Sequence, residues 1–197
     1  IRQVGDIERM VNEFSSFARM PAPKMRRENV QELLTQAVFL QRVAQPTISF
    51  EVKSPKEPIF FEADGRLVSQ ALTNVLKNAC EAIEARKATG DDGKGRVSVV
   101  LESDDERFSI RVIDNGIGLP PEHRHRLTEP YVTTRAKGTG LGLAIVRKIV
   151  EDHGGEIAID DAPGQQCAQI RLTFPLRQKV LKDLGGTNEQ ERLVDSA

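Results

Sequence analysis

Apolar residues recur at intervals of three and four in four separate stretches of the chain, and each stretch predicts an amphipathic helix. The four stretches are residues 2–19, 29–44, 64–85 and 141–153. Asp64 stands where the third helix needs an N-cap, and Gly154-Gly155 follows the last helix. Pro21 and Pro23 end the first helix, because proline cannot continue one.

Between the helical stretches, apolar and polar residues alternate in short segments that predict β-strands. The segments are residues 48–52, 59–61, 97–101, 108–113, 156–159 and 168–174. An acidic turn at residues 103–106 joins two of them and predicts a hairpin, whereas residues 116–138 show no strand pattern. Helices that alternate with mostly antiparallel strands favour a two-layer α/β sandwich of the α+β class.

These elements divide the chain into four parts. We expect one amphipathic helix at residues 1–20, a stiff linker at 21–27, the main domain at 28–176 and a polar tail at 177–197. The apolar stripe of the first helix must be covered by something outside the main domain. The chain opens at Ile1, without Met and inside a helical pattern, so we expect a piece of a longer protein.

The composition is that of a soluble globular protein, with 39% hydrophobic and 29% charged residues among 197. Its 28 basic and 29 acidic residues nearly balance, which excludes bulk electrostatic attraction to nucleic acid or an acidic membrane. No apolar run reaches the roughly 18 residues that span a bilayer, so we expect a cytoplasmic fragment without membrane contact, although the full-length protein could be anchored elsewhere in an inner membrane. Cys80 and Cys167 lack metal-ligand spacing and are expected to be buried thiols.

A glycine-rich segment at residues 137–143 carries the first candidate chemistry. Glycines stand at positions 138, 140 and 142, directly before an apolar helix. Glycine lets the backbone approach a ligand closely, and a helix N-terminus favours anions, so the segment predicts a cradle for phosphate groups. It matches neither GxxxxGK[ST] nor GxGxxG, which indicates another class of nucleotide site. Arg135 and Lys137 are basic residues that could neutralise phosphate oxygens.

Two further places carry polar residues that a plain core would not need. Asn74 and Asn78 lie four apart on one helix face, where their amide oxygens suit Mg²⁺, although the spacing fits two surface asparagines equally well. Asp114 ends a strand, where a buried carboxylate could accept a hydrogen bond from an amine such as that of adenine. Asp-Asn-Gly is also typical of a plain turn, and both interpretations stay open at this point.

Four motifs follow one another along the chain. They are Asn-x3-Asn-Ala at 74–79, Asp-x-Gly-x-Gly at 114–118, Pro-Tyr-x-Thr-Thr at 130–134 and Gly-x-Gly-x-Gly-Leu at 138–143. Their order resembles the catalytic ATP-binding domain of sensor histidine kinases, over residues 28 to about 175. The phrases EPYVTTR and KGTGLGLAIV are most similar to nitrogen-regulation sensor kinases of the NtrB and NtrY kind, and we favour NtrY.

The resemblance implies a Bergerat fold, a mixed sheet backed by three helices that is shared with gyrase, Hsp90 and MutL. ATP would lie between helices under a lid formed by residues 119–137. Asn78 would bind Mg²⁺ with support from Asn74, and Lys77 would approach the phosphates. Asp114 would recognise the adenine amine.

The remaining nucleotide contacts also come from the resemblance. The residues implied in the site are Asn74, Lys77, Asn78, Asp114, Gly116, Gly118, Tyr131, Thr133, Thr134, Arg135, Lys137, Gly138, Thr139, Gly140, Leu141 and Gly142. The glycines at 116 and 118 would admit the base, and those at 138, 140 and 142 would wrap the triphosphate. Tyr131 stands where the family usually has Phe, which keeps an aromatic ring and adds a hydroxyl.

By the same resemblance, the domain would transfer the γ-phosphoryl group of Mg-ATP to a histidine and thence to a cognate response regulator. Residues 1–20 resemble the second helix of a dimerising hairpin, whose absent first helix would carry that histidine, so the full-length protein would be a homodimer. His123 and His125 lie in the expected lid and His153 ends a helix, so none of them substitutes for the acceptor.

Two other functions compete with this one. The first is ATP hydrolysis of the gyrase, Hsp90 or MutL kind, in which a Glu activates water four residues before the Mg²⁺ asparagine. Asn74 occupies that position, and a neutral amide is a poor general base. The second is a degenerate nucleotide-binding or dimerisation module, against which the four intact motifs argue.

Overall fold

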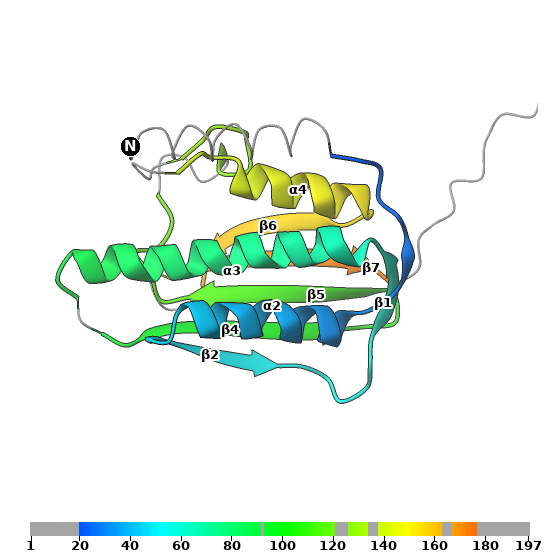
Figure 1. Ribbon diagram of the computed structural model, residues 1–197, viewed down its shortest axis with the longest axis horizontal. Helices are drawn as coiled ribbons and strands as arrows, with labels where there is room; N and C mark the ends of the chain where they lie inside the picture. Colours follow the sequence, from blue (N-terminus) through cyan, green and yellow to red (C-terminus); the bar gives the residue numbers. More distant parts are fainter. Residues whose placement is uncertain (1–19, 92, 121–125, 134–137, 163–166, 177–197) are drawn as a thin grey trace, which may run out of the picture.

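Three helices cover one face of a five-stranded sheet, and the opposite face carries none of the described helices (Figure 1). The computed structural model describes residues 20–91, 93–120, 126–133, 138–162 and 167–176. The elements are β1 (Arg26–Asn29), α2 (Val30–Ala44), β2 (Ile48–Lys53), β3 (Phe60–Ala63), α3 (Gly65–Ala88), β4 (Gly95–Ser103), β5 (Arg107–Asp114), α4 (Gly142–Asp152), β6 (Glu156–Asp161) and β7 (Ala168–Pro175). The predicted two-layer fold is confirmed.

The large sheet is mixed and mostly antiparallel, as the family resemblance implies. Its strand order is β2-β4-β5-β7-β6. β2 runs parallel to β4, with Ile48 opposite Gly95, and every other neighbouring pair is antiparallel. The predicted β4–β5 hairpin is present, and Asp104 Oδ1 closes its turn by accepting from the N–H groups of Glu106 and Arg107, each at 2.8 Å.

A second, two-stranded sheet was not predicted. β1 pairs antiparallel with β3, with Arg26 opposite Ala63 and Asn29 opposite Phe60. β1 begins inside the segment expected to be a linker, and its sequence Arg-Arg-Glu-Asn has no apolar residue. Backbone pairing and the Arg27 guanidinium, 4.4 Å from the centre of the Phe60 ring, hold this strand, and neither leaves an alternating apolar signal in the sequence. This small sheet joins the starts of α2 and α3.

Side-chain caps fix the starts of two helices. Asn29 Oδ1 accepts from the N–H of Gln31 at 3.0 Å at the start of α2. Asp64 Oδ1 accepts from the N–H groups of Arg66 and Leu67 at 3.1 and 3.3 Å, which confirms the predicted N-cap of α3. α4 ends before Gly154, whose φ of +71° favours glycine.

The core lies between the helices and the sheet, with α3 in the centre, packed against α2 on one side and α4 on the other (Figure 1). On β5 every second residue is buried, as alternation predicts. The rings of Phe61, Phe108 and Phe174 form a cluster with centroids 4.8 to 5.6 Å apart. Cys80 and Cys167 are both buried and not disulfide-bonded, as expected.

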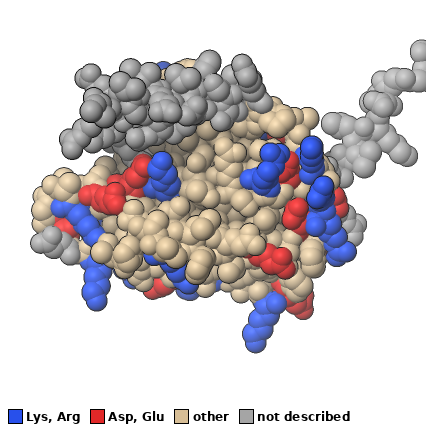
Figure 2. Space-filling view, in the orientation of Figure 1, with Lys and Arg blue, Asp and Glu red and all other residues tan. Residues whose placement is uncertain are grey.

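Uncharged side chains dominate the centre of the helix-covered side, and charged residues lie around its edges (Figure 2). Part of this surface is α2, where Phe39, Leu40 and Val43 are 61%, 60% and 67% exposed. The predicted helix at 1–19 and the tail at 177–197 lie outside the described residues. Within the described part of the chain, no helix combines the length and the apolar character needed to cross a membrane.

Candidate functional site

α3 brings two amide side chains to the start of α4. Asn74 Nδ2 donates to the carbonyl oxygen of Gly142 at 3.4 Å, across 68 positions of sequence. A Cβ atom placed on Gly142 would lie 4.0 Å from both amide atoms of Asn78. The predicted asparagine pair and the last glycine of the predicted phosphate cradle therefore lie side by side.

The loop that follows β5 packs against the same face of α3, four residues after Asn78. Ile117 N–H donates to the carbonyl oxygen of Ala82 at 3.2 Å. A Cβ on Gly116 would lie 2.5 Å from the carbonyl carbon of Ala82, so no other residue fits at 116 without moving the backbone. The helical period of 3.6 thus aligns Asn74, Asn78 and Ala82 along one line, with the cradle at one end and the Asp114 turn at the other.

Asp114 is the charged residue at the base of that turn, and it is only 6% exposed. Its Oδ1 atom accepts from the N–H of Gly116 at 2.9 Å. Burial and the negative charges of Glu84 and Asp114 raise the pKa of the Cys80 thiol to about 11, and burial and Asp114 also raise the pKa of Cys167. The Asp114 carboxylate is itself buried, and a charge-assisted hydrogen bond is strong where water is excluded.

The glycine cradle is tied to the preceding segment at Tyr131. Tyr131 N–H donates to the carbonyl oxygen of Gly140 at 3.1 Å. A Cβ on Gly140 would lie 2.6 Å from the carbonyl carbon of Tyr131, and both residues have positive φ, +69° and +67°. Positive φ is uncommon outside glycine, so Tyr131 holds a strained backbone conformation. Its ring is 63% exposed.

The first turn of α4 has the features of an anion site. No side chain among the described residues caps the helix at Leu141, although the Thr139 hydroxyl accepts from the Leu141 N–H at 3.4 Å. Helix N-termini carry N–H groups without intrahelical partners and a partial positive charge. The side of this first turn that faces Asn78 carries no side chain at position 142, because Gly142 has none.

Comparison with known proteins identifies this arrangement. Residues 63–178 match the family described as histidine kinase-, DNA gyrase B- and HSP90-like ATPase. The chain belongs to this ATPase family. Membership confirms the predicted resemblance, and it supports ATP as the nucleotide.

Two kinds of relative sharpen the comparison. The nitrogen regulation protein NtrY of Azorhizobium caulinodans is 58% identical over 175 residues, which are 88% of this chain and 22% of that protein. The mycobacterial sensor histidine kinase MprB matches in structure with a TM-score of 0.67 and 29% identity, over 77% of this chain and 97% of that chain. Full-length ShkA in complex with AMPPNP gives 0.70 and 30% identity, over 88% of this chain and 37% of that chain. The chain thus spans less than a third of the length of NtrY and of the NtrY-like protein of Rickettsia felis.

The described structure does not bring every predicted site residue of this ATPase domain to the junction of α3 and α4. Thr134, Arg135 and Lys137 lie outside the described residues, as do His123 and His125. Thr133 is exposed. Lys77 is on the outer side of α3, 55% exposed, where its ammonium lies 3.8 Å from Glu81 one turn later. The predicted contact of Lys77 with phosphate remains a prediction.

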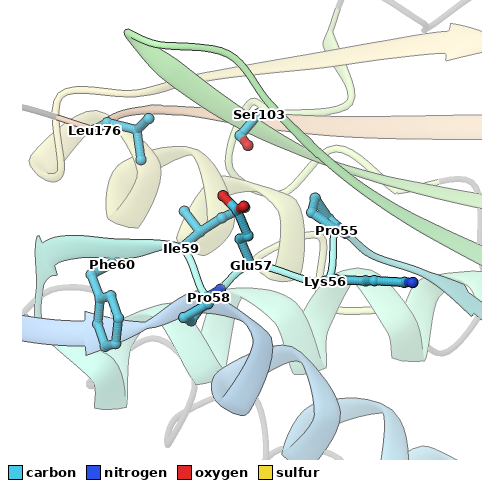
Figure 3. A pocket seen from close by; sticks show the side chains of 8 residues that line it. All are labelled: Pro55, Lys56, Glu57, Pro58, Ile59, Phe60, Ser103 and Leu176. Atoms are coloured by element: carbon cyan, nitrogen blue, oxygen red, sulfur yellow. The ribbon is translucent and has the colours of Figure 1, made fainter.

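One surface hollow of the described chain lies away from these residues. Its lining residues are Pro55, Lys56, Glu57, Pro58, Ile59, Phe60, Ser103 and Leu176 (Figure 3). Ser103 is at the far end of β4 from Val97, the residue opposite Asp114. Six residues of strand separate these ends by about 20 Å. This hollow is therefore not the nucleotide site that the four motifs predict.

Two further residues have roles that their residue types do not indicate, Ala82 at the site and His153 at the opposite end of α4. Ala82 lies four residues after Asn78 and receives the Asp114 turn, although its residue type predicts only an apolar position on the helix. His153 was taken as the end of a helix, yet it is 2% exposed and both ring nitrogens have hydrogen-bond partners. The helical spacing could have indicated Ala82, whereas nothing local to His153 indicates its distant partner.

Proposed function

We propose that this chain is the ATP-binding catalytic domain of a two-component sensor histidine kinase of the NtrY kind. It transfers the γ-phosphoryl group of Mg-ATP to a histidine outside the chain, and a response regulator receives the group next. The observation that carries this proposal is the direct meeting of the asparagine pair with the start of α4, through the contact of Asn74 with Gly142. Figure 1 shows α3 and α4 lying alongside each other, which brings these residues together.

The adenine end of the site is Asp114. Its buried carboxylate accepts the exocyclic amine of adenine, while Oδ1 keeps its bond to the Gly116 N–H. A carboxylate has about four lone-pair positions, so it can accept several hydrogen bonds at once. Gly116 lets the Asp114 turn pack directly against Ala82 of α3, and Gly118 adds no side chain beside the base. Gly118 has a φ of +79°, which favours glycine at this turn.

The phosphate end is the segment of residues 138–142 with the start of α4. The N–H groups of this helix face the phosphates, and Gly140 keeps the loop close to Tyr131. Thr133, Thr134, Arg135, Lys137 and Thr139 complete the contacts in this proposal. Phosphoryl transfer needs little covalent work from the protein, so positioning and electrostatic stabilisation are its main contributions.

The residues present fit a magnesium ion. The amide of Asn78 is a hard oxygen ligand, and Mg²⁺ usually keeps several waters and binds through one or two protein ligands together with substrate phosphates. No group of three His, Cys, Asp or Glu residues among the described positions could hold a metal, so a fully protein-bound metal centre is not indicated there. When bound, Mg²⁺ would neutralise charge on the phosphate oxygens. Asn74, held by Gly142, would position Asn78 from the preceding turn.

The acceptor histidine is not among the described residues. His153, the one histidine in the described part of the chain, is 2% exposed and bonded at both ring nitrogens, so it cannot attack a phosphoryl group. We place the acceptor on a dimerising hairpin that residues 1–20 complete. The full-length protein then acts as a homodimer whose catalytic domains lie in the cytoplasm, with its response regulator.

The same site argues against ATP hydrolysis. Gyrase-like hydrolysis needs a general base near the position of Asn74, and a side-chain amide does not accept a proton at neutral pH. The Asn74 amide also already donates to the Gly142 carbonyl. A water molecule in the site would therefore lack the group that activates it.

Incubation of the chain with γ-labelled Mg-ATP tests this function directly. We expect intact bound ATP, little free phosphate and no acid-labile label on the chain alone. Addition of a histidine-bearing hairpin from the NtrY relative should then produce acid-labile label on the hairpin. Steady release of phosphate would establish a hydrolase instead, and acid-labile label on the chain alone would place the acceptor within it.

A further inference from the structure

His153 is a buried titratable group that the proposed chemistry does not use. It directly follows α4 and lies against the ring of Phe174, with centroids 6.5 Å apart. Its Nδ1 atom lies 2.7 Å from the carbonyl oxygen of Ile149, in its own helix. Its Nε2 atom accepts from the N–H of Asp64 at 3.0 Å, across 89 positions of sequence. The two bonds together require the neutral ring with its proton on Nδ1.

Asp64 joins three parts of the chain. Its side chain caps α3, and its N–H is the group held by His153. Its Oδ2 atom also accepts from the backbone N–H of Lys24 at 3.0 Å, and the Arg66 guanidinium lies 3.1 Å away. Because Lys24 lies two residues before β1, the segment that enters the domain is tied to the same carboxylate as α3 and, through His153, to α4.

The contact of His153 with Asp64 and the contact of Asn74 with Gly142 hold the two ends of α4 against the first half of α3. From Asp64 to Asn74 the chain advances ten residues along α3, about 15 Å, and from Gly142 to His153 it advances eleven along α4, about 16 Å. α3 and α4 are therefore antiparallel, and the two polar contacts are almost equally far apart on both helices. Two such contacts fix how far α4 can slide along α3.

We infer that His153 is a positioning residue for the nucleotide site. Its bond to Asp64 sets the register of α4 against α3, and this register places the start of α4 opposite Asn78. The inference rests on the proposed function, because it concerns the placement of that same nucleotide site. Lys24 makes the register sensitive to the segment that precedes β1, which is where the proposed dimerising helix would connect.

Two substitutions of His153 separate the two bonds. Gln places its amide oxygen near the position of Nε2 and can still accept from the Asp64 N–H. Asn reaches only the position of Nδ1, so it can donate to Ile149 and cannot reach Asp64. The matched control for general destabilisation is Leu101→Ala, a buried change on β4, outside α3 and α4.

The test is calorimetric titration of the whole chain with AMPPNP and Mg²⁺, together with a melting curve of each variant. We expect His153→Asn to weaken affinity roughly tenfold, the effect of losing one buried hydrogen bond, and His153→Gln to stay within about threefold of the wild type. Leu101→Ala should lower the melting temperature without that loss of affinity.

Each other outcome decides against something specific. Wild-type affinity in His153→Asn, or equal losses in the Asn and Gln variants, would overturn the positioning role. Leu101→Ala could instead lose affinity in proportion to its fall in melting temperature, as His153→Asn does. The effect of His153 on affinity would then come from stability alone, and the positioning role would be overturned. Failure of the wild-type chain to bind AMPPNP would overturn the proposed function itself, which distinguishes that failure from the others.

Discussion

Replacing Asp114 by Asn probes the adenine end of the site with the smallest change of shape. The Asn side chain keeps Oδ1, which accepts from the Gly116 N–H at 2.9 Å in the wild type, so the turn should keep its conformation. The other carboxylate oxygen becomes an NH₂ group. That group is a donor, and it would face the donor amine of adenine.

The magnitude follows from the burial of the site. Asp114 is 6% exposed, so water cannot replace the lost acceptor. A hydrogen bond to a charged group contributes about 1.5–3 kcal/mol, which corresponds to a roughly 10- to 150-fold loss of affinity. Calorimetric titration with ADP measures this loss for the variant and the wild type.

Asp104→Asn is the matched control, because it makes the same chemical change in the turn at the other end of the β4–β5 hairpin. It should bind ADP as the wild type does. If Asp114→Asn binds ADP within twofold of the wild type, the carboxylate does not recognise adenine and the assignment is wrong. Equal losses in both variants would attribute the effect to net charge.

Three further predictions concern stability and reactivity. Burial raises the pKa of Asp64, but hydrogen bonds from Lys24 and Arg66 outweigh it and hold that pKa below 3.8. The carboxylate thus stabilises the fold above about pH 3.8 and loses this effect as pH falls through the folded-state pKa. Urea unfolding should show Asp64→Asn about 1–2 kcal/mol less stable at pH 7, and the difference should shrink as the pH falls below 3.8. A difference that is constant with pH would contradict this. Gly140→Ala should lower the free energy of unfolding by about 1–3 kcal/mol, because its Cβ would meet Tyr131 and its φ is positive. Gly142→Ala is the control and should change this free energy little in the same thermal unfolding experiment. Equal losses in the two variants would refute the close approach. Because burial raises the pKa of Cys80 to about 11, roughly one Cys80 thiol in 10,000 is ionised at pH 7. Mass spectrometry should therefore show that iodoacetamide labels Cys80 in urea and not in the native chain. Fast labelling of the native chain would refute the burial of Cys80.

Much of the fold could be predicted because its signals are local. The period of apolar residues marked the helices, and the caps at Asp64 and Gly154 were visible as residue types in the right places. Pairing between distant segments was not visible. No local pattern indicates that β2 lies parallel to β4, or that β4 starts so close to α3 that a Cβ on Gly95 would lie 2.6 Å from the Ile83 side chain.

The candidate site divides in the same way. The spacing of Asn74 and Asn78 follows from the helical period, so the sequence could indicate that they share a face. Their meeting with Gly142, the close approach of Gly116 to Ala82 and the bond from Asp64 to His153 depend on how α3 packs in three dimensions. Residue identity suggests which groups can bind a nucleotide, and only the packing shows which of them lie together.

The central claim is that this chain binds adenine nucleotide with magnesium at the junction of α3, α4 and the Asp114 turn. Calorimetric titration of the wild-type chain with AMPPNP, with and without Mg²⁺, tests it most directly. Saturable one-to-one binding that strengthens with Mg²⁺ and is lost for GTP is the predicted result. Absence of binding under both conditions, or equal affinity for ATP and GTP analogues, would contradict the account.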